Sequence, residues 1–370
     1  MAGGRGRGQG AGRGRPGQAR VRPPPRREAS GGGATASEEV LRRTLHNADG
    51  KPFAKYRNIQ GSFVTEGFEL FVDEVQGDRA GHTRMRVRVP MRRAGFPEDT
   101  RTDARRDALG DLIARRFWES ARTHARSPIP KADGGLVYMP RPGQEILRRG
   151  SVEVTEFHVE ARFTADLPSK AGKVDEEAAI DLIFGRISLI VSESMLFRSY
   201  RPQKLYAHLE TAENADRIRA SLRSRGLVAF VACGSVLPRR EDELAPMIGA
   251  VPFDCDDSLK VSMDVPNGEP VVGMGVPVGY TAVTGPVGSG KSVFADSVFA
   301  GVFDHIPGDG REYVVSDPDA VYVMAEPGRS CGGRTLSGPE SEVAAVDEAV
   351  EAGSGLIIID EEYSLSLIHI

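Results

Sequence analysis

The stretch TGPVGSGKSVF contains the residue types of a phosphate-binding loop. The pattern G-x-x-x-x-G-K-[ST] is met by Gly285, Gly290, Lys291 and Ser292. The glycines, Gly288 included, allow backbone N–H groups to close around phosphates, and a lysine at this position reaches the β- and γ-phosphates. The hydroxyl of Ser292 would bind Mg²⁺. The pattern therefore predicts a nucleoside triphosphate and Mg²⁺ as ligands, and a glycine-rich structural turn is the alternative.

This chemistry requires a strand before the loop and a helix after it. The segment YTAVT at 280–284 has the composition of a strand, and SVFADSVFAGVF at 292–303 that of a helix. The N-terminus of such a helix adds a partial positive charge where the phosphates would lie. The sequence thus predicts the order strand, loop, helix.

A metal-binding acid is expected at the end of a buried strand, and GLIIIDEE provides one. Leu356 to Ile359 is a continuous apolar run, which is typical of a central parallel strand. Asp360 would hold Mg²⁺ directly or through water, and Glu361 would polarise the attacking water as general base. The alternative is an acid pair that only marks a strand end.

Between these motifs, Ser337 and Gly338 begin a predicted helix that ends at Gly353. Three valines share one face of this helix: Val343, Val346 and Val350. A Ser-Gly turn at a helix N-terminus is an anion-binding device, although in isolation it is more often a helix cap. Leu336 precedes Asp360 by 24 residues.

Residues 37–260 have the pattern of a mixed α/β region. Helices are predicted from Ser37, over 103–122 and after Asp175, and strands over 63–75, 85–89 and 227–231. In the second strand, Arg84, Arg86 and Arg88 point away from the apolar side chains that alternate with them. We interpret this basic stripe as a solvated outer face, and RNA contact is the alternative.

Composition separates a basic tail from an acidic body. Residues 1–37 contain eight arginines and one glutamate, which gives a formal charge of +7. Because the whole chain has a net charge of −4, the remaining residues carry −11. Residues 1–36 are rich in Gly, Arg and Pro and are predicted to be disordered. Their Arg-Gly pairs resemble RNA-contacting boxes, while simple composition bias and a mitochondrial presequence are the alternatives.

The remaining composition limits the class of protein. The chain has 370 residues, no apolar run long enough for a membrane span and no secretory signal. Its three cysteines show no disulfide framework or zinc spacing, which favours a reducing compartment. We therefore expect a cytoplasmic protein without membrane partners, with mitochondria as the alternative.

Several segments together resemble the ATPases of the ABC class, which join an N-terminal domain of their own to an ABC-type cassette. DEVQGD at 73–78, PGQEILRR at 142–149, EARFTADLPSKAGK at 160–173 and RGLVAFVACGSVLPRR at 225–240 resemble the N-terminal domain. MGVPVGYTAVTGPVGSGKS and FDHIPGDGREYVVSDPDAV resemble the start of the cassette. The interval from Leu336 to Asp360 is similar to that between the signature motif and the second Walker motif. The resemblance covers roughly residues 40–362.

The resemblance implies a fold, a cofactor and a partner. It implies an α/β fold with a disordered RG-rich tail (1–36), an N-terminal domain (37–260) and an ABC-type P-loop cassette (261–370). It further implies ATP binding by a homodimer in which each signature turn closes on the ATP of the other protomer. Ser337 and Gly338 would then contact the γ-phosphate held by the partner's Lys291 and the partner's Ser292.

The sequence departs from the family pattern in two places. No glutamine lies between Lys291 and Leu336, so no ordinary Q-loop is assigned. After Glu362 the chain reads YSLSLIHI, which matches nothing in the family, so we expect an incomplete cassette that hydrolyses ATP poorly.

Three functions remain in competition. The first is a Mg²⁺-dependent ATPase that drives its N-terminal domain, with RNA as a candidate target. The second is a nucleotide- or RNA-binding module without hydrolysis. The third is a P-loop kinase of a small metabolite, for which the interval from Leu336 to Asp360 has no role.

Overall fold

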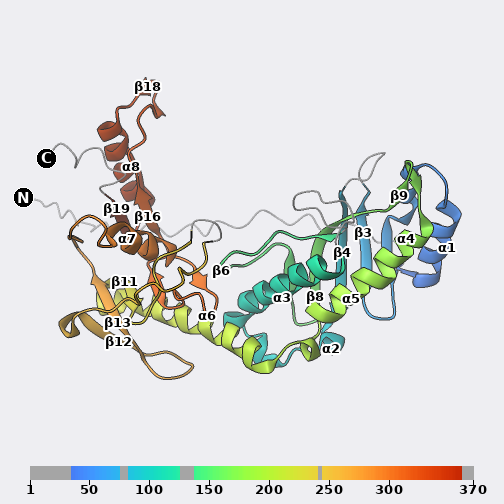
Figure 1. Ribbon diagram of the computed structural model, residues 1–370, viewed down its shortest axis with the longest axis horizontal. Helices are drawn as coiled ribbons and strands as arrows, with labels where there is room; N and C mark the ends of the chain where they lie inside the picture. Colours follow the sequence, from blue (N-terminus) through green and yellow to red (C-terminus); the bar gives the residue numbers. More distant parts are fainter. Residues whose placement is uncertain (1–34, 76–81, 126–136, 241–243, 361–370) are drawn as a thin grey trace, which may run out of the picture. The chain divides into compact units, whose positions relative to one another are not determined.

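The computed structural model describes residues 35–75, 82–125, 137–240 and 244–360 (Figure 1). By its contacts the chain divides into two units, 1–34 and 35–370. Nearly all of the tail predicted over 1–36 lies outside the described residues. Ala36 is an exception, because it pairs with Phe63 at the edge of a sheet. Regular structure therefore begins slightly before the predicted boundary.

Seven strands of the described N-terminal region form one sheet. The order is β1-β2-β3-β4-β8-β5, and β7 also pairs with β8. The strands are β1 (Ala36–Ser37), β2 (Gly61–Val64), β3 (Glu69–Glu74), β4 (His82–Pro90), β5 (Val137–Tyr138), β7 (Val152–Val154) and β8 (His158–Asp166). The single strand predicted over 63–75 is wrong, since β2 and β3 form a hairpin. Its turn is closed by the Thr65 N–H, which donates to the Phe68 carbonyl at 3.0 Å.

Helices pack against this sheet and share its core (Figure 1). They are α1 (Glu38–Ala48), α2 (Met91–Ala94), α3 (Asp103–His124), α4 (Glu176–Ile180), the π-helix η3 (Asp181–Ile187) and α5 (Ser188–Ser194). The 3₁₀ turns are η1 (Phe53–Ile59), η2 (Glu98–Thr100) and η4 (Phe197–Ser199), and β9 (Ser169–Lys170) pairs with β10 (Lys173–Val174). The predicted helices from Ser37, over 103–122 and after Asp175 are confirmed. Asp175 caps the last of them by accepting the Ala178 N–H at 3.2 Å.

A second, antiparallel sheet lies between two helices. Its order is β12 (Lys260–Met263), β13 (Val271–Pro277), β11 (Leu227–Ala232) and β15 (Val314–Ser316). Phe230 and Ala232 join a cluster with residues of α6 (Pro202–Leu222), while Ala229 and Val231 join one with Val298 of α7 (Lys291–Ala300). Both faces of β11 are therefore buried, which explains why the predicted strand at 227–231 is apolar throughout. The turns η5 (Arg223–Arg225) and η6 (Asp257–Leu259) flank this sheet.

The last described elements follow the phosphate-loop sequence. They are β16 (Ala320–Val323), β17 (Ser330–Cys331), β18 (Arg334–Thr335), α8 (Gly338–Ala352) and β19 (Leu356–Ile359). The parallel arrangement predicted for 356–359 is confirmed, because β19 pairs in parallel with β16. Its predicted central position is not seen, since within the described residues β19 has β16 as its one neighbour.

Two further sequence predictions meet different outcomes. The helix predicted to end at Gly353 is confirmed, and that glycine has the left-handed φ of +81°. The strand predicted at 280–284 is wrong, as these residues have no regular structure and Tyr280 is 96% exposed. No described strand pairs with this segment, so its backbone groups lack the ladder partners that define a strand.

A short strand pair joins the segment after α7 to the N-terminal region. Residues of β14 (Asp304–His305) pair with β6 (Glu145–Ile146), and the Ile306 N–H donates to the Gln144 carbonyl at 3.0 Å. Arg219 of α6 holds the Asp304 carboxylate at 2.7 Å. The helix that follows the phosphate loop is thus connected to β6 by only a few residues.

The fully buried carboxylate of Asp111 supports β6 through two arginines. Asp111 of α3 accepts from Arg115 Nε at 2.6 Å and from Arg149 Nε at 2.5 Å, and His208 Nε2 of α6 lies 3.4 Å away. Both arginines also donate to the Glu145 carbonyl, at 2.7 and 3.2 Å. Asp111 therefore fixes the two side chains that hold the backbone of β6.

Candidate functional site

The phosphate-loop residues form an exposed turn that leads into α7. Gly288 and Gly290 have φ of +77° and +91°, a left-handed conformation that glycine adopts without strain. Gly290 is the N-cap residue of α7, whose first residue is Lys291. The Lys291 Nζ donates back to the Gly285 carbonyl at 3.1 Å and to the Pro286 carbonyl at 3.4 Å. The loop thus places Lys291 beside its own carbonyls at a helix N-terminus, a position where a partial positive charge favours anions.

The helix predicted over 292–303 is confirmed in position by α7, which spans Lys291–Ala300. Its N-terminal Ser292 is half-buried, while residues 281–290 are exposed. A glycine-rich turn with a purely structural role would be expected to pack against a neighbouring helix or strand. The exposure of the whole loop favours a ligand site over that alternative.

Asp360 follows β19 and is buried, with 6% of its surface exposed. The Tyr322 hydroxyl of β16 donates to its Oδ2 at 3.3 Å and also hydrogen-bonds the carboxylate of Asp296 on α7. Burial, and then the charge of Asp360, raise the pKa of Asp296. The predicted metal acid therefore lies against the phosphate-loop helix, in a carboxylate-rich setting that a divalent cation would stabilise.

Asp296 and Tyr322 are site residues that sequence reasoning missed. Asp296 is the acidic residue in the segment that becomes α7. An acid within this largely apolar segment was the signal that could have identified it as a site residue. Burial raises the pKa of Tyr322, to which both carboxylates contribute, so its hydroxyl stays a hydrogen-bond donor. Glu361, the predicted general base, lies outside the described residues.

Ser337 and Gly338 mark the start of α8, as predicted. The Ser337 N–H and hydroxyl both donate to the Glu340 carboxylate at 2.9 Å, so the turn acts as a helix cap. Along α8, Val343 and Val350 are 61% and 63% exposed. The valine face predicted from the sequence therefore points outward, at least within the described residues.

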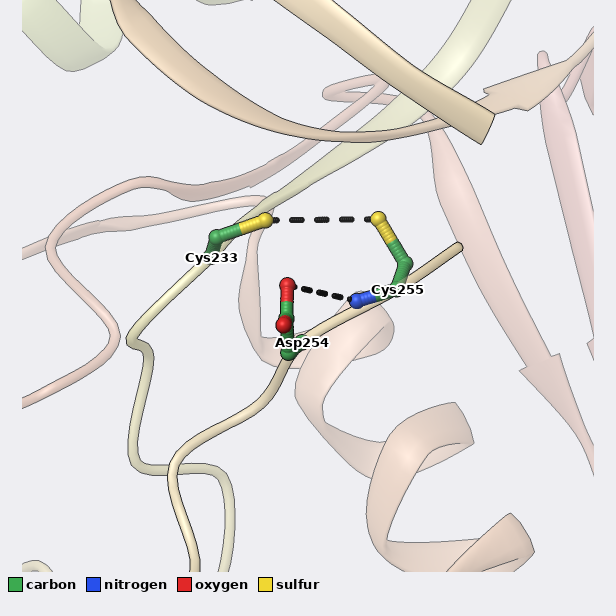
Figure 2. A group of neighbouring side chains, drawn as sticks. All are labelled: Cys233, Asp254 and Cys255. Atoms are coloured by element: carbon green, nitrogen blue, oxygen red, sulfur yellow. Dashed lines mark hydrogen bonds between the residues drawn. The ribbon is translucent and has the colours of Figure 1, made fainter. Parts of the chain in front are cut away.

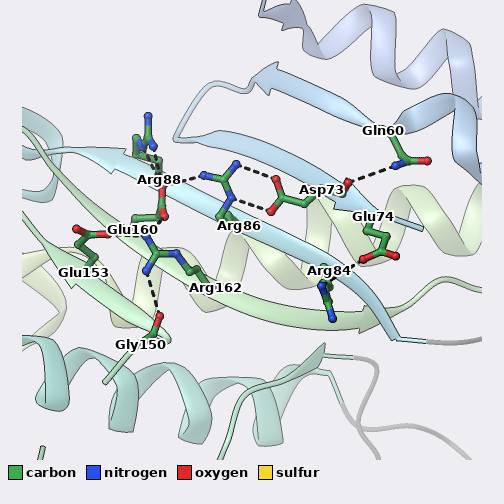
Figure 3. A network of polar contacts seen from close by, with 10 residues as sticks. All are labelled: Gln60, Asp73, Glu74, Arg84, Arg86, Arg88, Gly150, Glu153, Glu160 and Arg162. Atoms are coloured by element: carbon green, nitrogen blue, oxygen red, sulfur yellow. Dashed lines mark hydrogen bonds and ion pairs between the residues drawn. The ribbon is translucent and has the colours of Figure 1, made fainter. Parts of the chain in front are cut away.

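The arginine stripe of β4 forms part of a network of paired charges (Figure 3). Arg86 is bidentate to Asp73, with both distances 2.7 Å, and Arg88 lies 2.7 Å from the buried Glu160. The remaining pairs in the network are Arg84–Glu74, Arg86–Glu160, Arg162–Glu153 and Arg162–Glu160. The formal charges of these four guanidinium groups and four carboxylates cancel. The stripe is thus a charge-balanced sheet face, with little net attraction for RNA.

The comparisons with known proteins cover both halves of the chain. The model of the N-terminal region of ATPases of the ABC class matches residues 38–198, and the model of their P-loop domain matches residues 201–337. The chain belongs to the ATPases of the ABC class. Its α/β fold is accordingly that of a nucleotide-binding P-loop ATPase preceded by the family's N-terminal domain.

A curated relative of this ABC-class ATPase is an uncharacterized protein from Methanocaldococcus jannaschii. The two are 25% identical over an alignment of 181 residues, and the match covers 41% of this chain and 40% of the relative. The chain thus matches less than half of the relative's length. Among the described residues of the ABC-class ATPase, no helix has both the length and the apolar character needed to cross a membrane.

The donor set of the site fits the metal that the family implies. A serine hydroxyl at the start of α7 and the buried carboxylate of Asp360 are hard oxygen ligands, which Mg²⁺ prefers. The P-loop domain of this ATPase class generally binds ATP with Mg²⁺. Ser292 and Asp360 are the residues of this chain that would hold the ion.

Proposed function

We propose that this ABC-class ATPase binds Mg·ATP in the loop 285–292 and hydrolyses it. The observation that carries the proposal is Lys291, whose ammonium group donates to two loop carbonyls at the N-terminus of α7. Backbone N–H groups of the loop and Lys291 would hold the phosphates, and Mg²⁺ on Ser292 and Asp360 would neutralise their charge. Glu361 would orient and deprotonate the attacking water.

We further propose that ATP binding is coupled to the N-terminal region. The connection is short: α7 ends at Ala300, and β14 pairs with β6 four to five residues later. The backbone of β6 is held by Arg115 and Arg149, and both are fixed by Asp111. A shift of α7 on nucleotide binding would therefore act on α3 through these contacts.

The resemblance to ABC-type cassettes also leads us to propose a homodimer. Ser337 and Gly338 of one protomer would face the ATP bound by the partner's Lys291. The Ser337 cap is solvent-exposed, so its hydroxyl could exchange Glu340 for a phosphate oxygen. If the sites form between protomers, turnover per chain rises with protein concentration, whereas a monomeric ATPase shows constant specific activity.

The metal role of Asp360 is tested by phosphate release with and without Mg²⁺. Replacing Asp360 by Asn should lower Mg²⁺-dependent turnover roughly a hundredfold, because a catalytic metal contributes about 3 kcal/mol or more to the transition state. Glu361→Gln should slow turnover and leave ATP binding intact. Asp347→Asn, on the exposed side of α8, is the matched control and should behave as wild type.

The same assay separates the competing functions. ATP binding without Mg²⁺-dependent phosphate release would favour the non-hydrolysing module, and phosphate transfer to a small acceptor would identify a kinase. Turnover that is unchanged in both Asp360→Asn and Glu361→Gln would refute the assignment of these residues.

We propose RNA binding by the tail as a second function, on the observation that its eight arginines stand among glycines. If all eight paired with phosphates of single-stranded RNA, the log–log salt slope would be roughly −6. Incomplete pairing makes a slope of about −3 to −5 the expected result. RNA affinity of the full chain and of a form lacking residues 1–36, measured at several salt concentrations, tests this.

A variant with all eight arginines replaced by lysine is the matched control for charge. It should keep most of the slope, while replacement by glutamine should abolish it. Equal affinity and slope with and without the tail would exclude the tail as the RNA site, and cleavage of the tail in an organelle would favour a presequence.

A further inference from the structure

Two cysteines that stand 22 positions apart, and the aspartate before the second of them, meet beside β11 (Figure 2). The ligand atoms of Cys233, Asp254 and Cys255 all lie within 4.8 Å of one another, and the two sulfurs are 4.0 Å apart. Two thiolates on one tetrahedral Zn²⁺, each bound at about 2.3 Å, are separated by about 3.8 Å. The observed sulfur separation therefore already suits a shared metal ion.

The backbone holds this arrangement without help from a ligand. The Gly234 N–H donates to the Phe253 carbonyl, and the Phe253 N–H donates to the Ser235 carbonyl, both at 2.7 Å. The Cys233 N–H is bound by the Val272 carbonyl of β13 at 3.0 Å. Gly234 has a φ of +87°, which allows the chain to turn immediately after Cys233. The two ligand-bearing segments are thus fixed to each other.

The donor types select the class of metal. Thiolates are soft ligands that prefer Zn²⁺ and related ions to Mg²⁺. The Cys255 N–H donates to Asp254 Oδ1 at 2.9 Å and holds the pKa of that carboxyl low, so it is charged at neutral pH. Burial and the neighbouring Cys233 raise the pKa of Cys255 to about 11, so metal binding would release a proton from the Cys255 thiol.

Lys260 is a cation that lies beside this group. Its Nζ lies 3.5 Å from Asp254 Oδ1 and 2.8 Å from Asp257 Oδ1. Asp257 therefore offers the ammonium group a closer partner when Asp254 binds a metal ion instead. The Lys260 charge weakens a metal site here but does not block it.

We propose that Cys233, Cys255 and Asp254 bind one divalent cation of the thiophilic class to which Zn²⁺ belongs. Three protein ligands leave a fourth position for water or an outside ligand, and Asp254 is exposed. The neighbouring Phe253 ring packs on Phe294 of α7, with ring centroids 6.0 Å apart. The ion would therefore fasten a segment that contacts the phosphate-loop helix, at a site distinct from that of Mg·ATP.

The test uses the full chain, reduced and free of nucleotide, with Co²⁺ as the probe. We expect one equivalent of Co²⁺ to bind with the near-ultraviolet charge-transfer absorption of cobalt–thiolate bonds, and Zn²⁺ to displace it. Cys233→Ser and Cys255→Ser should each lose most of this absorption, and Asp254→Asn should weaken binding roughly tenfold or more, at least about 1.4 kcal/mol. Cys331→Ser, at the third cysteine, should leave the absorption unchanged.

A second measurement covers the case that a serine variant does not fold. In the wild-type chain, Zn²⁺ should protect Cys233 and Cys255 from alkylation, as read by peptide mass spectrometry. No saturable cobalt–thiolate absorption, equal absorption in the Cys233→Ser/Cys255→Ser double variant, or alkylation unaffected by Zn²⁺ would overturn the proposal. Recovery of a Cys233–Cys255 disulfide with no Co²⁺ binding after reduction would replace the metal site by a redox pair. Because no readout involves nucleotide, failure here leaves the proposed ATPase function untouched.

Discussion

Replacing Lys291 by alanine is expected to weaken the binding of a labelled ATP analogue by roughly ten- to a hundredfold. The ammonium group is the cation of the loop, with the Gly285 carbonyl 3.1 Å away. A hydrogen bond between charged groups contributes about 1.5–3 kcal/mol, and the upper value corresponds to about two orders of magnitude in Kd. Equilibrium binding by filtration or fluorescence, in the presence of Mg²⁺, measures the effect.

Lys204→Ala is the matched control for Lys291→Ala. Lys204 is an exposed lysine in the first turn of α6, outside the phosphate loop. Its removal changes the net charge by the same amount and should leave nucleotide affinity within about twofold, as expected for a surface substitution. Equal binding by wild type and Lys291→Ala would show that the loop does not hold the nucleotide.

Replacing Asp111 by alanine is expected to lower the free energy of unfolding by about 3–5 kcal/mol. Removal of one partner from a buried ion pair leaves the other charges uncompensated, which is the costly case. Asp111 is fully buried, and its loss would strand Arg115 and Arg149, whose side chains are each only 15% exposed. Denaturant unfolding at neutral pH gives the difference. Asp107→Ala, on the exposed side of the same helix, should change stability by about 0.5 kcal/mol or less.

The ionisation of Asp111 should also make the free energy of unfolding depend on pH. Burial alone would raise the pKa of Asp111, but the nearby His208 imidazole, the hydrogen bond from Arg115 and the charges of Arg115 and Arg149 outweigh it and lower the pKa. A lowered folded-state pKa stabilises the protein fully above the unfolded value of about 3.9, and this contribution is lost as the pH falls through the folded value. The stability gap between wild type and Asp111→Asn should therefore be constant near neutrality and narrow below about pH 4. A gap that narrows on raising the pH instead would contradict this role.

Features set by local sequence were predictable here. The helices α7 and α3 and the buried strand β11 each follow from the residue types of their own segments, and the structure has them at the expected places. The acid after 356–359 was found for the same reason, since an apolar run followed by a carboxylate identifies a strand end without knowledge of its neighbours.

Features set by distant partners were not predictable. The strand expected at 280–284 requires pairing, and its composition cannot supply a partner. The hairpin of β2 and β3 was missed although Gly67 offered a turn signal between the two apolar runs, and a backbone bond from Thr65 to Phe68 closes its turn. Cys233 and Cys255 stand 22 residues apart and resemble no zinc motif, yet the pairing of their segments brings the sulfurs together.

The pairing of β6 with β14 has a consequence for how the chain acquires its structure during synthesis. The paired residues, Ile146 with Asp304 and Glu145 with His305, are 158 and 160 positions apart. At about 5–20 residues per second, β6 waits on the order of ten seconds for its partner to leave the ribosome. Arg115 and Arg149 come from segments made at nearly the same time as β6, so we expect them to reach the Glu145 carbonyl during that interval. Because both bonds persist in the folded chain, where β14 pairs with β6, the Asp111 network would hold β6 in place before the ATP-binding region is made.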